Sequence, residues 1–316
     1  MAEVNARLLV RRLLAGVLAL LGATLIAFAL GVIAPGDPAV QALRQGPFDE
    51  PDPLAVLELR HRWGLDRPLP LQYLHWLGRL SRGDLGVSYS TRERVITELG
   101  RRLPATLLLA VTATALAAVL GVAGGLVCAR WAGGPLDALL RTLSGIVASL
   151  PVFLTGMLLI VVFAEQLRAL PTSGYGSLAQ LVLPALALGL GEAARLLRLT
   201  RTQLVDELAR DYVRTARAKG LARGRVALRH ALPNVLLNVT TAVGLHFGAI
   251  LGGAAVVETV FAWPGIGRLS VESVFRRDYP VVQGLVVLSA ALYIAVNLIV
   301  DLLYSVVDPR LRVGGA

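Results

Sequence analysis

Long apolar stretches separated by shorter polar segments dominate the chain. Six stretches are long enough to span a hydrocarbon core, and they cover about residues 12–34, 103–129, 142–164, 178–198, 234–261 and 281–307. A span of about 30 Å takes roughly 20 helical residues, and backbone groups in lipid must bond within their own helix. The pattern therefore predicts an all-α polytopic membrane protein with six transmembrane helices.

Three parts follow from this pattern. Residues 1–34 form a basic N-terminus and first span, 35–102 a polar segment, and 103–316 a five-helix core with a polar loop at about 199–233. The first part also resembles a signal peptide, but its apolar run is longer than the usual 7–15 residues, so we expect it to remain as a span. Turn residues such as Pro35-Gly36-Asp37-Pro38 alternate with helical stretches in 35–102. We expect a small ordered cap there, either a platform for an outside partner or a folded lid.

The composition agrees with a membrane protein. Of 316 residues, 55% are hydrophobic and only 16% charged, with a mean hydropathy of +0.66, whereas soluble domains carry about a quarter charged residues. A disordered tail and an ordinary soluble enzyme are therefore excluded. The single Cys128 and four histidines without ligand spacing give no support for a disulfide or a metal site. No catalytic residue and no metal ligand is predicted.

The net charge of +10 is unevenly placed. Residues 195–229 hold ten basic and three acidic side chains, while 35–102 holds ten and nine. Basic residues in short loops and at the termini favour both termini in the cytoplasm, with 35–102 outside. The charge thus fits a cytoplasmic loop near anionic lipid, and nucleic acid is not expected as a partner.

The basic loop has helical periodicity. Apolar residues recur at Leu204, Leu208, Tyr212 and Ala216, and arginines lie on another face. This predicts one amphipathic helix that continues from the fourth span and ends near Lys219-Gly220, where glycine takes the positive φ of a helix stop. A second short helix from Arg223 to His230 should be broken at Leu232-Pro233.

The order of residues in this loop carries a family resemblance. Tyr212-Val-Arg-Thr-Ala-Arg-Ala-Lys-Gly220, then nine residues, His230, one residue and Leu232-Pro233 resembles the cytoplasmic loop of bacterial ABC importer permeases. That loop has Glu-Ala-Ala, three residues, glycine, nine residues, an aliphatic residue, any residue and Leu-Pro. Here Arg214-Thr215-Ala216 replaces Glu-Ala-Ala and His230 replaces the aliphatic residue, a form usual in the dipeptide/oligopeptide/nickel branch.

Other motifs extend the resemblance over nearly the whole chain. They are Gly36-Asp37-Pro38-Ala39, Leu65-Asp66-Arg67-Pro68-Leu69, Leu103-Pro104-Ala105-Thr106, the run from Phe261 to Arg268, Arg277-Asp278-Tyr279-Pro280-Val281, and Asn297 to Asp301 followed by Asp308-Pro309-Arg310. The chain is similar to the first permease subunit of binding-protein-dependent importers. This implies a multi-pass protein of the bacterial inner membrane with four kinds of partner: a second homologous permease, two cytoplasmic ATPases, an extracytoplasmic binding protein and membrane lipid.

The resemblance also implies roles for residues. The ATPase-coupling residues would be Tyr212, Arg214, Thr215, Ala216, Arg217, Ala218, Lys219, Gly220, Leu221, His230, Leu232 and Pro233. The outer gate would include Trp263, Pro264, Gly265, Gly267 and Arg268. The chain has no GxxxxGK[ST] loop, so no cofactor is expected in it, and ATP and Mg²⁺ belong to the partner ATPases.

Within the membrane, Gly244, Gly248 and Gly252 form a small-residue stripe that should allow close helix packing. His246 faces away from that stripe, either hydrogen-bonded between helices or lining the pathway. Glu192 and Arg195 read as a structural pair, and Pro151 and Pro184 should bend their helices. We expect a transport subunit that is not an enzyme, carrying di- or oligopeptides. The alternatives are a nickel or metal-chelate importer and, more distantly, an ion-driven secondary transporter, for which the chain lacks internal repeats.

Overall fold

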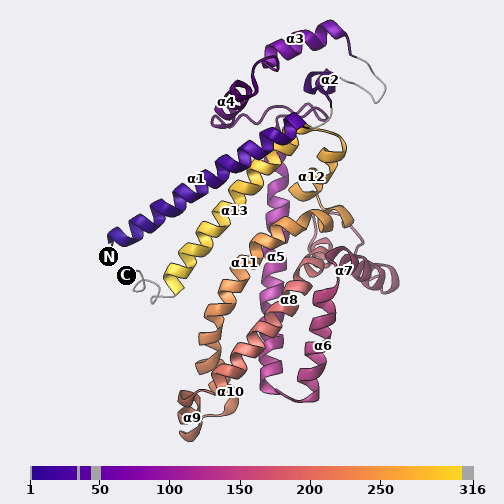
Figure 1. The fold of residues 1–316 in the computed structure, drawn as a ribbon. Helices are drawn as coiled ribbons and strands as arrows, with labels where there is room; N and C mark the ends of the chain where they lie inside the picture. Colours follow the sequence, from indigo (N-terminus) through magenta and orange to yellow (C-terminus); the bar gives the residue numbers. More distant parts are fainter. Residues whose placement is uncertain (1, 34–35, 44–50, 308–316) are drawn as a thin grey trace. The chain divides into compact units, whose positions relative to one another are not determined.

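The computed structural model describes residues 2–33, 36–43 and 51–307, and the described side chains exclude those of 2–13, 223, 237, 245–246, 249, 251–253 and 299–307. The regular secondary structure of the described part is helical, apart from one antiparallel bridge between Val87 and Arg94 (Figure 1). The α-helices are α1 (Ala2–Ile33), α2 (Pro38–Leu43), α3 (Pro53–Trp63), α4 (Leu69–Leu80), α5 (Val95–Arg130), α6 (Pro135–Ser149), α7 (Val152–Leu159), α8 (Leu178–Leu208), α9 (Asp211–Ala218), α10 (Arg223–Val226), α11 (Leu232–Val260), α12 (Ile266–Phe275) and α13 (Tyr279–Val307). Two π-helical stretches are η1 (Ile160–Gln166) and η2 (Ala227–Ala231).

The chain forms two compact units. One comprises Met1–Pro104 and Leu269–Ala295, and the other Ala105–Arg268 and Val296–Ala316. The start of α13 belongs to the same unit as α1 to α4.

Four described helices are long and apolar enough to cross a membrane: Leu14–Ile33, Val95–Arg130, Leu178–Leu208 and Tyr279–Leu298. Helix α6 and the stretch formed by α7 and η1 are bent by 109° relative to each other. Counted together as one broken span, they bring the number of such spans in the described residues to five. The expected span 142–164 falls on this bent pair, and the bend lies at Leu150-Pro151, where Pro151 was expected to bend the helix. Pro184, by contrast, lies inside the unbroken α8. The expected span 234–261 coincides with α11, some of whose side chains lie outside the described residues.

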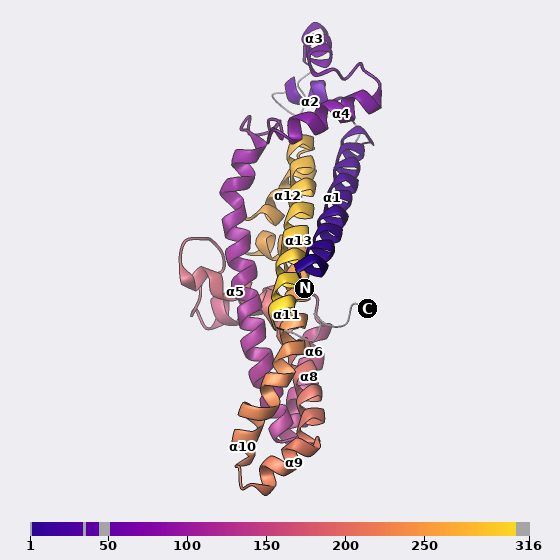
Figure 2. The ribbon, with the colours of Figure 1, turned by 90° about the vertical axis from the view of Figure 1, so that its left-hand side faces the viewer.

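In the first unit, α1 runs antiparallel to the start of α13. A Cβ on Gly16 would touch Ile294 at 3.0 Å, and one on Gly31 would collide with Gln283, so the two backbones approach closely (Figure 2). Helix α4 is attached to α1, because the Thr24 and Tyr73 hydroxyls are 2.9 Å apart and Phe28 packs against Tyr73 edge-on. The part of the cap after residue 51 is therefore ordered.

In the second unit, α5 and α8 pack through glycines. A Cβ on Gly121 would come within 2.5 Å of the Leu196 Cβ, and one on Gly125 within 2.5 Å of the Thr200 Cβ. A Cβ on Gly189 would lie 2.8 Å from the Ala113 carbonyl oxygen. Gly121 and Gly125 form a GxxxG motif, which brings helices together in membranes. The sequence interpretation found the glycine stripe of the fifth span and missed this one.

The contact of Gly189 gives a testable expectation. Replacing Gly189 with alanine should destabilise the protein by about 1–3 kcal/mol, because α8 would have to move away from the α5 backbone. Gly191, two residues further along α8, has nothing within 4 Å of its Cβ position. Gly191→Ala is the matched control and should leave the thermal unfolding midpoint of the purified protein unchanged or slightly raised. Equal midpoints for the two variants would contradict this packing.

Candidate functional site

The 199–233 segment folds as a short helix between two long ones. Helix α8 ends at Leu208, Ala209 and Arg210 form a turn outside any helix, and α9 runs from Asp211 to Ala218. Figures 1 and 2 both show α9 and α10 together at one end of α8 and α11. The expected single helix through residue 219 is therefore wrong. Arg210 takes an extended conformation at the N-cap of α9, which turns α9 away from the axis of α8.

Gly220 ends α9 as expected. Its φ is +82°, a left-handed conformation that costs a residue with a side chain about 1–2 kcal/mol. The Gly220 N–H donates to the Arg217 carbonyl at 2.9 Å and the Leu221 N–H to the Ala216 carbonyl at 3.3 Å. These bonds satisfy the last carbonyls of the helix. The sequence prediction of a positive φ at this glycine is confirmed.

The expected break at Leu232-Pro233 does not occur. Helix α10 continues through η2 directly into α11, with Pro233 in the first turn of α11, where a missing N–H costs no helical bond. The His230 carbonyl accepts from Asn234 Nδ2 at 3.3 Å and from the Tyr212 hydroxyl at 3.4 Å. The His230 side chain itself is exposed.

A buried carboxylate attaches α9 to both long helices. Glu207, 8% exposed, accepts from the Tyr212 hydroxyl at 2.8 Å and from Asn234 Nδ2 at 2.9 Å, and Arg210 Nε lies 2.9 Å from its other oxygen. We call these four residues the Glu207 network. Burial, and then the hydrogen bond to Glu207, raise the pKa of Tyr212, so its hydroxyl remains a donor at physiological pH. The network joins the end of α8, the start of α9 and the start of α11.

The outward face of α9 is basic. Val213 is fully buried beneath the helix, while the exposed side includes Arg214, Thr215, Arg217, Ala218 and Lys219. Arg214 pairs with Asp211 at 3.4 Å, but both side chains are more than three-quarters exposed, so the pair adds little stability. Helix α9 is thus anchored by one face and presents cationic side chains on the other.

A second ion pair braces α8. Asp137, fully buried at the start of α6, accepts from Arg201 Nε at 2.8 Å and from Nη2 at 2.7 Å, and the Gly133 N–H donates to it at 3.0 Å. A bidentate arginine–carboxylate contact fixes geometry as well as charge. Arg201 therefore has a structural partner within the chain, in addition to its place among the basic loop residues.

The motif from Phe261 to Arg268 surrounds a third buried carboxylate. Glu258 is fully buried and accepts from the Thr106 hydroxyl at 2.6 Å and from the Arg268 N–H at 2.9 Å. The Ile266 N–H donates to Thr106 Oγ1 at 2.9 Å. This set, the Glu258 network, places a negative charge at the N-terminal turn of α12, where unpaired N–H groups and the helix dipole stabilise it.

The neighbouring residues explain the rest of that motif. Trp263, 1% exposed, donates from Nε1 to the Ala105 carbonyl at 2.9 Å and meets Tyr175 edge-on at 4.8 Å between ring centroids. A Cβ on Gly265 would collide with the Glu258 carboxylate, and one on Gly267 would lie 2.5 Å from the Ala255 Cα. Only glycine therefore lets the turn approach the Glu258 carboxylate and the Ala255 backbone this closely. In the sequence, Pro264 stands between Trp263 and Gly265. Four of the five expected gate residues thus sit in or against one packed turn, and Arg268 joins it through its backbone.

Comparison with known proteins identifies the family. Residues 121–313 match the family described as "Binding-protein-dependent transport system inner membrane component", and residues 5–110 match its N-terminal counterpart, "Binding-prot-dependent transport system membrane comp, N-term". The chain belongs to this family. It is an ABC importer permease of the oligopeptide/dipeptide/nickel type, located in the bacterial inner membrane.

Similar proteins agree along the length of the chain. It is 42% identical over 303 residues to the "Glutathione transport system permease protein GsiC" of Escherichia coli O6:H1 and to that of Pectobacterium atrosepticum, covering 96% of this chain and 98% of each relative. In fold it resembles a chain of the inward-facing "MetNI methionine ABC transporter", with a TM-score of 0.57 and 18% identity over 66% of this chain and 96% of that one. Such permease subunits are not enzymes, and ATP is hydrolysed by a separate subunit. Membership implies a permease partner, ATPase subunits and a binding protein.

The permease contains functional candidates that sequence reasoning missed. They are the buried Glu207, Asp137, Glu258 and Thr106, and the exposed Asn234 that donates to Glu207, and none belongs to the loop pattern that carried the resemblance. A buried acid in an apolar run is a usable signal, since an unpaired charge there is costly. Glu258 is such a residue, whereas Glu207 was counted as a loop charge. Glu192 and Arg195 form the expected ion pair.

Some predicted positions lie outside the described residues. These are the side chains of His246, Gly252 and Asp301. Gly244 and Gly248 are half-buried in α11, and their packing role remains a prediction. Among the described residues, no three His, Cys, Asp or Glu side chains gather in a way that would hold a metal ion.

Proposed function

We propose that this permease forms half of the translocation pathway for short peptides delivered by an extracytoplasmic binding protein. The observation that carries the substrate class is the 42% identity, over almost the full length, to permeases named for glutathione, itself a tripeptide derivative. The chain has no GxxxxGK[ST] nucleotide-binding loop. ATP and Mg²⁺ therefore bind to two partner ATPases, and this chain binds no cofactor. A second permease of similar fold supplies the other half of the pathway.

The proposed topology has six spans with both termini in the cytoplasm. The positive charge of the 199–233 segment supports this, since basic residues in short loops remain inside. In that arrangement α9 faces the cytoplasm, and the segment 35–102 and α12 face outward. The exposed leucines of α1 then lie in the membrane, in contact with lipid.

In the proposed mechanism, α9 is the coupling helix. Its exposed basic face docks on an ATPase, and its buried side is held by Val213 and the Glu207 network. Because Glu207 ends α8 and Asn234 begins α11, a rigid-body movement of α9 pulls on both helices together. ATP-driven closure of the two ATPases is thereby converted into a change of the pathway, with no covalent chemistry in this chain.

Gly220 provides the test of this coupling. Gly220→Val should reduce peptide uptake by about tenfold or more, because a β-branched residue in a left-handed conformation displaces the end of α9. Uptake and ATP hydrolysis are measured on the complete transporter reconstituted in liposomes with its binding protein. The ratio of peptide transported to ATP hydrolysed should fall, while membrane insertion remains normal.

Two variants serve as controls. Gly224 is helical and, like Gly220, has open space at its Cβ position, so Gly224→Val changes side-chain size without the backbone penalty. Arg60, far from this loop in sequence, should also be replaceable by glutamine without loss of coupling. Wild-type uptake in Gly220→Val would reject the coupling role of α9.

The substrate class has its own measurement. A strain lacking the permease should lose uptake of labelled di- and tripeptides, and the cloned chain with its partners should restore it. Radioactive nickel is compared in the same strain. Nickel uptake that depends on the chain, without peptide uptake, would replace the peptide proposal by the metal one. Uptake that persists without the ATPases but collapses with the ion gradient would indicate a secondary transporter.

A further inference from the structure

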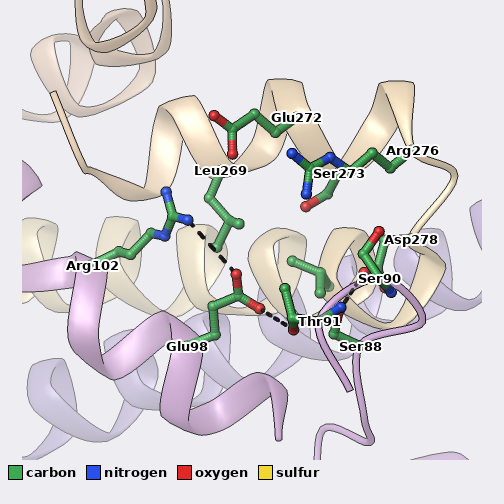
Figure 3. Close-up of a pocket in the computed structure, with 11 residues that line it drawn as sticks. Ser88, Ser90, Thr91, Glu98, Arg102, Leu269, Glu272, Ser273, Arg276 and Asp278 are labelled. Carbon is green, nitrogen blue, oxygen red and sulfur yellow. Dashed lines mark hydrogen bonds and ion pairs between the residues drawn. The ribbon is translucent and has the colours of Figure 1, made fainter. Parts of the chain in front are cut away.

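The first unit contains a polar cleft outside the networks described above. It has a volume of about 100 Å³, is partly open to solvent, and lies between the start of α5, the loop before it, and α12 (Figure 3). The charged residues that line it are Glu98, Arg102, Glu272, Arg276 and Asp278. This volume is smaller than that of drug-sized ligand sites, which are roughly 300–1,000 Å³, so the cleft can hold a small group such as one carboxylate.

The acidic groups of the cleft already have partners. Asp278 accepts from the Ser88 hydroxyl at 2.5 Å and from the N–H groups of Tyr89 and Ser90, each at 3.1 Å. Glu98 accepts from the Thr91 hydroxyl at 3.3 Å and lies 3.8 Å from Arg102 Nη2. Glu272 also has an interaction within the described part of the chain. The carboxylates are therefore largely satisfied by the protein.

The donors are not satisfied in the same way. Ser273, on α12, lines the cleft. Arg276, also at the cleft, has no ion pair there, and Arg102 has only its long contact to Glu98. Figure 3 shows both guanidinium groups directed toward the space between α5 and α12. Two guanidinium groups and a serine hydroxyl therefore line the same cleft, and a ligand that accepts charge-assisted hydrogen bonds fits this place.

We propose that the cleft is a carboxylate-binding site in which Arg276, Arg102 and Ser273 hold the ligand. A planar guanidinium matches a carboxylate with two parallel hydrogen bonds. A doubly charged phosphate fits less well, since three carboxylates of the chain line the same cleft. The ligand is therefore a group with a single negative charge. Such a carboxylate is found at the C-terminus of a zwitterionic peptide and on an aspartate or glutamate side chain.

The source of the carboxylate rests on the proposed function, in which this unit faces outward. One source is the C-terminus of a peptide released from the binding protein, and the other is an acidic side chain of the binding protein itself. Arg276→Gln removes one guanidinium and leaves the Glu98–Arg102 pair in place. Arg277→Gln is the matched control, because Arg277 is the adjacent exposed arginine and does not line the cleft.

The experiment uses the complete transporter in nanodiscs and two probes. The first probe is trialanine, and its control is trialanine amide, which keeps the ammonium group and lacks the carboxylate. Binding of either peptide is measured as a rise in the thermal unfolding midpoint of the transporter. The second is the purified binding protein, whose Kd for the transporter is measured directly. Neither readout uses uptake or ATP, so a failure of the site is distinguishable from a failure of the importer function.

The outcomes separate the sources. If trialanine but not its amide stabilises wild type and Arg277→Gln, and Arg276→Gln loses affinity about tenfold, a free peptide carboxylate occupies the cleft. If only the Kd of the binding protein rises about tenfold in Arg276→Gln, its acidic side chain is the ligand. If Arg276→Gln and Arg277→Gln behave alike with both probes, the cleft is not a carboxylate site.

Discussion

Replacing Glu258 with alanine should abolish uptake and destabilise the permease by roughly 3 kcal/mol or more, because two hydrogen bonds to a buried charged group are lost and a cavity remains. Thr106 would keep the bond from the Ile266 N–H but lose its acceptor, and the first turn of α12 would lose its negative charge. Helix α12 would then no longer be fixed against the end of α11. The unfolding midpoint and the yield of folded protein measure the effect.

Variants of Thr106 separate the hydrogen bond from the loss of volume. Thr106→Ser keeps the hydroxyl and should retain most of the stability, whereas Thr106→Val keeps the shape and should lose a large part of it. Thr259→Ala is the control on α11, the helix of Glu258. Thr259 is exposed and its hydroxyl donates to the Ala255 carbonyl of the same helix. Wild-type stability of both Glu258→Ala and Thr106→Val would show that the network does not hold this turn.

The features predicted correctly from the sequence depend on local chemistry. The end of α9 at Gly220 follows from the need of a helix stop for positive φ, and the long helices follow from runs of apolar residues. Local patterns also misled. The apolar spacing from Leu204 to Ala216 continues unchanged through the break at Ala209-Arg210, so periodicity could not reveal the turn. Pro233 indicated a break, but the π-helical stretch before it keeps the chain helical.

What the sequence could not reveal are the pairs that join distant parts of the chain. Thr106 and Glu258 are 152 residues apart, Asp137 and Arg201 are 64 apart, and Glu207 and Asn234 are 27 apart. Each pair is an ordinary polar combination, and nothing in spacing selects it from the other acids and donors of the chain. Burial determines which acids must have a partner, because an acid in an apolar core needs one. Which acids are buried is known only once the packing of the helices is known.

Removing the Glu207 carboxylate should uncouple transport from ATP hydrolysis. In Glu207→Ala, Tyr212 and Asn234 lose their shared acceptor and Arg210 its ion-pair partner, so α9 is held mainly by Val213. Hydrogen bonds to a charged group are worth about 1.5–3 kcal/mol each, enough to let α9 move relative to α8 and α11. We expect ATP hydrolysis by the complete transporter to persist while peptide uptake falls about tenfold.

A purely structural role would lower both activities together, so the amount of peptide moved per ATP is the decisive measurement. Tyr212→Phe removes one donor and should give an intermediate ratio, and Asp206→Asn, at the exposed neighbouring position, should leave the ratio unchanged. A double-mutant cycle of Glu207→Ala with Asn234→Ala should show coupling of about 0.5–3 kcal/mol in thermal unfolding, as expected for groups in one network. If Glu207→Ala loses ATP hydrolysis and uptake in equal proportion, then this carboxylate only supports the fold, and movement of α9 reaches α11 through the backbone of α10 and η2 instead.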